Sequence, residues 1–269
     1  MYNSAYRQDI QSTMSNVTLD HARKLINGIR ATFLSGPPPA PPVDPNLLFD
    51  VNFNDSLEVD YSIDGAALTF EPSNASSVTL NDGFVSMSNP HYIKLTQGLP
   101  AYLKHTGDQS WVFNFRAEAT SSNKFLFQTC PLEDNSTQSP ENYLTGIYVS
   151  VHGDYSFFTF YKAPRVILVG GQVEIGNLNF NIDVQSIVLT YKRDGHELRY
   201  YFNGVHLFTA TAPAGNEAEV ISWENSDNLY INRFFRYSPF QPAHYHKISV
   251  YDKILTLPEI VDIYNASQS

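Results

Sequence analysis

One stretch of the chain, residues 223–246, combines aromatic rings with polar side chains in a way that suits sugar recognition. Aromatic faces offer apolar surface on which sugar rings stack, while amide, carboxylate, imidazole and guanidinium groups bond to the surrounding hydroxyls. The alternative is that these aromatic residues fill the core of a β domain and pack between copies in an oligomer. Both interpretations stay open, and the candidate glycan contacts are Trp223, Asn225, Asp227, Arg236, Tyr245 and His246.

The sequence contains none of the short motifs that carry common catalytic chemistry. There is no Gly-x-Ser-x-Gly, no phosphate-binding loop and no His-Glu-x-x-His. The acidic pair Glu133–Asp134 would point to opposite faces of a strand, and we expect it in a solvated loop. His244 and His246 would face the same way on a strand, as metal ligands sometimes do, but no third ligand is identifiable. We therefore predict that the protein is not an enzyme and has no metal ligands.

The composition excludes several other classes of protein. Of the 269 residues, 42% are hydrophobic, 14% aromatic and only 16% charged, which is unlike a disordered chain or a coiled-coil rod. The net charge of -10 opposes a phosphate backbone, and no run of three Lys or Arg offers a basic patch, so we expect no nucleic-acid partner. The longest apolar run is far shorter than a membrane span, and the N-terminus lacks the apolar region of a secretory signal.

The elements that position these residues divide unequally at a proline tract. Residues 37–45 hold six prolines and predict a stiff polyproline linker. Before it, residues 1–36 form a predicted anchoring or oligomerisation segment with a helix over about 18–34. Two heptads of apolar residues need a partner for stability, either another copy, another protein or the chain's own β domain. The apolar stripe of this helix consists of Leu19, Ala22, Ile26, Ile29 and Phe33.

From residue 46 to residue 269 the pattern changes to the period of two that is typical of strands. Residues 111–117 alternate large aromatic residues with smaller ones, and 146–161 read as a hairpin. Asn203–Gly204 between two alternating segments is the strongest short-range hairpin signature. Many short strands without interleaved helices predict an all-β fold, a two-sheet antiparallel sandwich or barrel.

The end of the chain predicts one short helix after the last strand. It begins at Leu257, with Pro258 at an early position where proline is tolerated. Ile260, Ile263 and Tyr264 lie on its apolar face, which we expect to cap one edge of the sandwich.

Five segments also follow a recognisable order. They are LLFDVNFND (47–55), FVSMSNPHYIKL (84–95), WVFNFRAEA (111–119), IVLTYKRDGHELRYYFNGVHL (187–207) and HKISVYDKILTLPEIVDIYN (246–265). Together they resemble the laminin-G-like branch of the concanavalin A-like lectin/glucanase superfamily. The resemblance implies a two-sheet jelly roll over about residues 46–267, preceded here by the N-terminal helix and the proline-rich linker.

The resemblance bears on activity and on metal as well. The Glu-x-Asp-x-(x)-Glu motif of the superfamily's glucanases is absent, which disfavours hydrolysis. Laminin-G-like domains often bind Ca²⁺ through loop oxygens, so Asn225, Asp227 and Asn228, or Asn81 and Asp82, are conceivable ligands. Neither group matches a calcium-loop pattern, and an ordinary turn is the alternative; we predict no cofactor, with Ca²⁺ as the exception to test.

The layout favours a non-enzymatic structural or adhesion protein of a virus or phage particle, such as a capsid decoration protein or a fibre. In this hypothesis the N-terminus binds a capsid or other virion protein and the lectin-like domain is displayed on the virion surface. We expect a homo-oligomer, a dimer or a trimer, and a possible cell-surface glycan as ligand. The alternative is a carbohydrate-binding lectin module outside a virion, and a weaker one is a glycoside hydrolase or lyase with an atypical site.

Overall fold

The structure is a computed structural model that describes residues 43–54, 56–81, 83–87, 91–104, 107–117, 123–130, 146–152, 155–163, 166–175, 184–212, 228–232 and 243–268. The chain divides into two units, Met1–Asp44 and Pro45–Ser269, and both sheets belong to the second. The predicted helix over 18–34, its apolar stripe and most of the proline tract lie outside the described residues, so they stay predictions.

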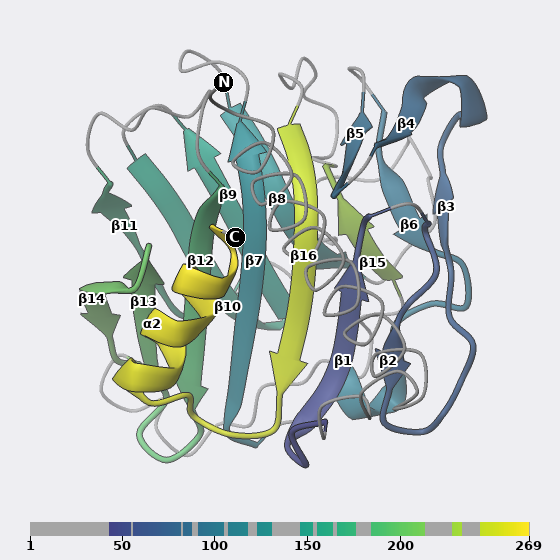
Figure 1. Cartoon of the computed structure of the whole chain (residues 1–269). Helices are drawn as coiled ribbons and strands as arrows, with labels where there is room; N and C mark the ends of the chain where they lie inside the picture. The colour runs from purple at the N-terminus through teal and green to yellow at the C-terminus, as the bar shows by residue number, and fades with distance from the viewer. Residues whose placement is uncertain are drawn as a thin grey trace, which may run out of the picture. The chain divides into compact units, whose positions relative to one another are not determined.

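The second unit consists of two antiparallel sheets (Figure 1). The larger sheet has nine strands in the order β14-β13-β12-β7-β16-β1-β2, with β5 pairing β16 and β4 pairing β5. Its strands are β1 (Leu47–Asn52), β2 (Tyr61–Ser62), β4 (Val78–Asn81), β5 (Phe84–Met87), β7 (Gln109–Ala117), β12 (Gln185–Lys192), β13 (Glu197–Phe202), β14 (Val205–Ala210) and β16 (Ala243–Tyr251).

The smaller sheet has seven strands in the order β11-β10-β9-β8-β15-β6-β3. Its strands are β3 (Phe70–Pro72), β6 (Ile93–Leu95), β8 (Asn123–Cys130), β9 (Gly146–His152), β10 (Tyr155–Ala163), β11 (Val166–Glu174) and β15 (Asn228–Ile231). Two short 3₁₀ turns, η1 (Ala75–Ser77) and η2 (Ala101–Lys104), and the helix α2 (Leu257–Ala266) complete the described elements. The predicted two-sheet antiparallel sandwich is confirmed.

Strand alternation builds the core between the sheets. On β7, Trp111, Phe113 and Phe115 all point inward and are buried. The Trp111 and Phe113 rings lie 5.1 and 4.9 Å from the ring of Phe127 on β8 of the opposite sheet. At the other end of the sandwich the ring of Phe158 stacks on Tyr200 at 4.8 Å. The aromatic residues counted in the sequence therefore fill a wide inter-sheet layer.

The predicted hairpins form where the turn residues allow them. Asn203 and Gly204 take left-handed backbone conformations, with φ of 49° and 78°, and join β13 to β14. Both φ values are positive, as a type I′ turn requires, and this twist matches that of the flanking strands. The β9–β10 hairpin is also present, with His152 opposite Tyr155.

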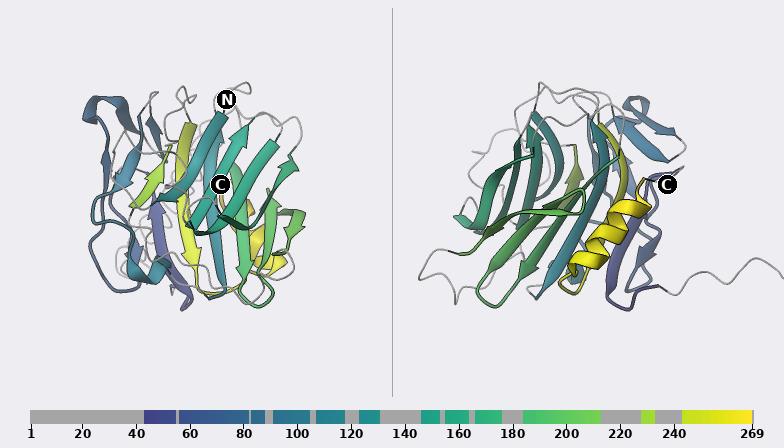
Figure 2. Two further views of the ribbon diagram at one scale, coloured as in Figure 1. Left: turned by 180° about the vertical axis from the view of Figure 1, so that it is seen from behind. Right: turned by 60° about the vertical axis from the view of Figure 1, so that its left-hand side comes forward.

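Helix α2 begins as predicted but packs in a different place. Thr256 precedes it, and the Glu259 carboxylate accepts hydrogen bonds from the Thr256 backbone N–H and hydroxyl, both at 2.7 Å. Its buried residue, Ile260, packs against Val112 on β7 and Val188 on β12, the side chains that point away from the core. The helix therefore covers part of the outer face of the nine-stranded sheet, whereas capping of an edge was expected (Figure 2).

Candidate functional site

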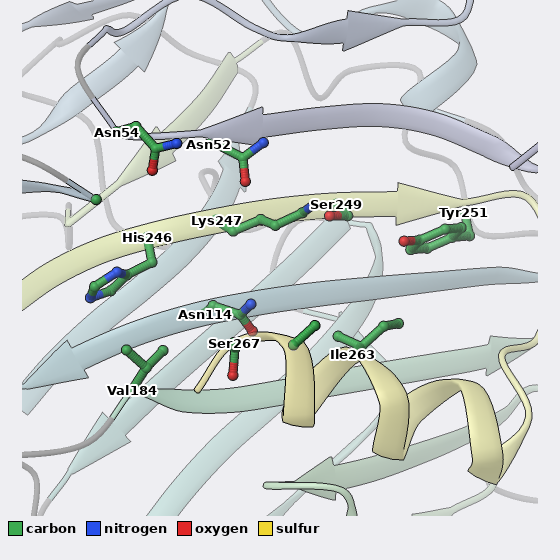
Figure 3. A pocket seen from close by; sticks show the side chains of 12 residues that line it. Asn52, Asn54, Asn114, Val184, His246, Lys247, Ser249, Tyr251, Ile263 and Ser267 are labelled. Carbon is green, nitrogen blue, oxygen red and sulfur yellow. The ribbon is translucent and has the colours of Figure 1, made fainter. Parts of the chain in front are cut away.

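The outer face of the nine-stranded sheet carries the pocket that we take as the candidate site. α2 covers the side of this face over β12 and β13, where Val112, Val188, Tyr201, Leu255 and Ile260 form a second apolar cluster. Beside the helix, over β16 and β1, the face is hollowed into a pocket of about 370 Å³. Figure 3 shows how strand and helix side chains surround it.

Most of the lining is polar, and it comes from elements far apart in the sequence. β1 and the residues after it contribute Asn52 and Asn54, β7 contributes Asn114, and β16 contributes His246, Lys247, Ser249 and Tyr251. The helix side consists of Ile263, Ala266 and Ser267, and the lining is completed by Gly83 and Val184.

A β-bulge places two neighbouring residues of β16 on this same face. Tyr245 pairs with Phe115 and Lys247 pairs with Asn114, so that His246 is the additional residue. Tyr245 points into the core, while His246 and Lys247 both line the pocket. Without the bulge, alternation would turn one of these two side chains inward.

Asn114 lies at the bottom of this arrangement and has an unsatisfied acceptor. The residue is 6% exposed, and its Oδ1 atom is buried without a hydrogen-bond partner. An unpaired buried polar atom costs about 1–3 kcal/mol. Native structures leave few such atoms without a partner, so this one requires an explanation.

His246 carries a second unpaired atom. Its Nε2 is also buried without a partner. Burial, the positive charge of Arg116 and the neighbouring His244 together lower the pKa of His246 to about 4, although a hydrogen bond with the Gly83 backbone opposes the shift. The ring is therefore neutral at pH 7, and one of its nitrogens is an acceptor.

On the β1 side of the pocket, the charged side chains form an ion pair and hydrogen bonds with their neighbours. Lys247 Nζ lies 3.1 Å from Asp50 Oδ2, and the Ser249 hydroxyl donates to Asp50 Oδ1. The side-chain amide of Asn52 donates to Asp60 Oδ2 at 3.1 Å. Among the described lining residues, Lys247 is the one Lys or Arg, and Asp50 neutralises it.

Tyr251 provides an aromatic surface at the other end of the pocket. It is half-buried and packs against the cluster under α2, and Lys253 Nζ lies 5.9 Å from its ring centroid. His246 and Tyr251 are five positions apart on one strand, and both line the pocket. The pocket thus has an aromatic ring at one end and two buried acceptors at the other.

A separate cluster lies next to the His246 end. The His244 ring stacks on Phe84 at 4.2 Å, and its Nδ1 lies 2.6 Å from Arg116 Nη2. Arg116 also lies over the Phe84 ring, 5.6 Å from its centroid. Arg116 is therefore engaged beside the pocket and does not line it.

The structure places two of the six glycan candidates. His246 lines the pocket, whereas Tyr245 is 3% exposed in the core and donates its hydroxyl to Asn232 Oδ1 at 3.1 Å. Burial raises the pKa of Tyr245 well above its usual range. The Tyr245 ring is thus unavailable as a sugar platform. The other candidates, Trp223, Asn225, Asp227 and Arg236, lie outside the described residues.

The sequence interpretation missed most of the pocket. The missed residues lie on strands whose inward-facing residues alone were assigned from the sequence. They are the outward-facing Asn114, Lys247 and Ser249. One indication was available, because Asn114 interrupts the aromatic and aliphatic run of residues 111–115. Its meaning depended on knowing that α2 ends beside it.

Metal and membrane features are limited within the described part of the chain. No group of three or more His, Cys, Asp or Glu residues there could hold a metal ion. Of the candidate calcium ligands, Asn81 and Asn228 are described and Asp82, Asn225 and Asp227 are not. No described helix is long and apolar enough to cross a membrane.

Comparison with known proteins reveals similar structures and no similar sequence. No protein-family model matches the chain, and no curated protein matches it. A structure concerning botulinum neurotoxin type C, whose cell entry depends upon interaction with two ganglioside molecules, is 13% identical with a TM-score of 0.60; the match covers 83% of this chain and 52% of that one.

Two further matches are binding domains of related neurotoxins. The serotype D domain is 10% identical with a TM-score of 0.59, and the match covers 82% of this chain and 52% of that one. The DC domain, in complex with rat synaptotagmin II, is 11% identical with a TM-score of 0.59, covering 83% and 52%. The chain spans about half the length of these structures, and at such low identity the likeness shows the fold alone.

Proposed function

We propose that the protein is a non-enzymatic carbohydrate-binding module whose binding site is the pocket beside α2. The observation that carries the proposal is the lining itself: amides, hydroxyls, a neutral imidazole and one tyrosine ring around about 370 Å³. Small-molecule sites combine an apolar surface with a few polar groups that fix orientation. For a sugar, Tyr251 supplies the ring and the Asn, Ser and His side chains supply the polar groups.

The fold and the comparisons support this class of ligand. The chain resembles the laminin-G-like branch of the lectin/glucanase superfamily in its sequence order, and we propose that it is a divergent member of that branch. A structural neighbour interacts with gangliosides, which are glycolipids. The resemblance and the neighbour each support a glycan-binding β-sandwich and not a particular glycan, because the residues of the site decide which ligand binds.

The lining also favours binding over hydrolysis. Glycosidases use two carboxylates about 5–9.5 Å apart on either side of the scissile bond. The described lining of the pocket includes no Asp or Glu, and the nearby Asp50 is held by Lys247 and Ser249. A hydrolase or lyase would need a different site.

A glycan array tests the proposal with a matched pair of variants on α2. Ala266 is exposed and lines the pocket, while its neighbour Asn265 is exposed and does not. Ala266→Trp should fill the pocket and abolish glycan binding, and Asn265→Trp should bind as the native chain does. A native chain that binds no glycan, or an Ala266→Trp variant that binds normally, contradicts the proposal.

A second proposal concerns where the module works. The division into the units Met1–Asp44 and Pro45–Ser269, together with the predicted apolar stripe of residues 18–34, favours display of the sandwich through an N-terminal anchor. We propose a virion surface protein that forms a dimer or trimer and binds a capsid or other virion protein through this anchor. Deletion of residues 1–45 should leave a folded sandwich that no longer assembles, as measured by light scattering. If the truncated chain forms an oligomer with the same number of copies as the full chain, the proposed anchor is contradicted.

A further inference from the structure

We infer that the pocket takes an uncharged sugar whose hydroxyl groups donate to two acceptors at one end of the pocket, Asn114 Oδ1 and His246 Nε2. The inference rests on the proposed function and narrows the ligand to neutral glycans over acidic ones such as sialylated glycans. Three features carry it: an unpaired buried amide oxygen, an imidazole with its free nitrogen at the same end, and the absence of an uncommitted cation in the described lining.

The first feature is the Asn114 side chain. Asn114 is 6% exposed, lines the pocket and leaves Oδ1 without a partner. On the same strand and the same face, Val112 is apolar and packs under α2. A buried acceptor that lines a pocket suits a hydroxyl donor that comes from a ligand.

The second feature is the orientation of His246. The hydrogen bond with the Gly83 backbone falls to Nδ1, because Nε2 has no partner. A ring that donates through Nδ1 is neutral and has its lone pair on Nε2. The groups around it are cationic or neutral: Arg116, His244 and Lys247. Burial, the charge of Arg116 and the neighbouring His244 oppose a second proton and hold the pKa of His246 at about 4, so Nε2 stays an acceptor at pH 7.

The third feature is the charge around the pocket. Lys247, the one Lys or Arg of the described lining, is bound to Asp50, and Asp60 is bound to Asn52 on the same side. The nearby Arg116 is engaged with His244 and Phe84. A sugar carboxylate would meet two acceptors, and the one Lys of the described lining already pairs with Asp50. A neutral sugar would instead supply hydroxyl donors to these acceptors.

Calorimetry on the full chain tests the inference with one glycan in two forms. The probes are a ganglioside oligosaccharide and the same oligosaccharide after removal of its sialic acid. The neutral form should bind at least tenfold more tightly. Equal or tighter binding of the acidic form overturns the inference and leaves the proposed function standing. If neither these probes nor any glycan of the array binds, the proposed function fails and the inference fails with it.

Two variants test the acceptors themselves. Asn114→Leu keeps the shape and removes the acceptor, so affinity for the neutral glycan should fall at least tenfold; Asn81→Leu, on β4 outside the lining, should bind normally. Native binding should weaken as the pH falls through about 4, where His246 gains a proton and Nε2 becomes a donor. His246→Gln retains an acceptor and should bind without this loss at low pH. Unchanged affinity in Asn114→Leu, or the same pH profile in His246→Gln, overturns the inference.

Discussion

The two halves of the outer face of the nine-stranded sheet differ although they belong to the same strands. Val112 and Asn114 are two residues apart on β7 and point the same way, yet the first packs under α2 and the second lines the pocket. On β16, Tyr251 reaches the helix cluster while Ser249 and Lys247 form polar contacts. The covered half consists of apolar side chains buried under α2, and the uncovered half includes two buried polar atoms without a partner, Asn114 Oδ1 and His246 Nε2.

The difference indicates where stability and binding reside. Substitutions in the covered half remove buried apolar surface and should lower the free energy of unfolding. Substitutions of Asn114 or His246 in the uncovered half remove buried acceptors that have no partner within the protein, and they should change binding instead. The four predictions below separate these effects, beginning with the largest change in stability.

Ile260→Ala should destabilise the protein by about 2–5 kcal/mol, because Ile260 is fully buried between α2 and the sheet. Urea denaturation measures this change. Asp262→Ala, an exposed position on the same helix, is the control and should change the free energy of unfolding by less than about 0.5 kcal/mol. If Ile260→Ala changes the free energy of unfolding as little as the control does, the packing of α2 contributes little to the stability of the covered half.

Gly204→Ala should cost about 1–2 kcal/mol. Gly204 has a φ of 78°, where a Cβ atom is strained, and a Cβ there would contact Val261 of α2 at 3.5 Å, an ordinary distance. Strain in the β13–β14 turn is thus the cause, and thermal unfolding detects it. Gly204→Asn should retain most of the stability, since Asn tolerates this conformation; a loss as large as that of Ala would point to crowding instead.

The N-terminus of α2 should make stability depend on acid pH. Hydrogen bonds from Lys253 and Thr256 lower the pKa of Glu259 to about 2. Its stabilisation is therefore complete above about pH 4.5 and is lost as the pH falls toward 2. Glu259→Gln should cost about 1 kcal/mol or less at pH 7, because the carboxylate is largely exposed. The variant's unfolding free energy should also fall less between pH 4.5 and 2 than that of the native chain.

Asn114→Leu should leave the free energy of unfolding within about 1 kcal/mol of the native value, because it replaces an unsatisfied acceptor by apolar surface. The same denaturation experiment as for Ile260→Ala applies. A loss of more than about 2 kcal/mol would mean that Asn114 belongs to the packing of the sheet. A neutral result, together with lost glycan binding, would separate the two halves cleanly.

Much of the sandwich was predictable from local patterns. The inward set Trp111, Phe113 and Phe115 follows from alternation, and the β13–β14 turn follows from Asn203–Gly204. The start of α2 at Leu257 follows from the proline and glutamate after Thr256. These features depend on backbone geometry within a few residues, so a single sequence is sufficient to recognise them.

The candidate site was predicted at one residue, His246. Its position on the outer face depends on a bulge that no local pattern in residues 243–251 indicates, because the extra residue is defined by the pairing of β16 with β7. Tyr245, interpreted from the same aromatic-rich stretch, is turned into the core by that register. A one-residue change in pairing decides which of two neighbours meets solvent.

By itself, the sequence determined the class of fold, the apolar layer between the sheets, the hairpin at Asn203–Gly204 and the terminal helix. These are set by side-chain period and by backbone conformations that few residues tolerate. Tertiary structure alone decided that α2 lies on a sheet face and stops short of β16 and β1. That placement creates the pocket, because it covers Val112 and leaves Asn114 beside an open space lined from strands far apart in the chain.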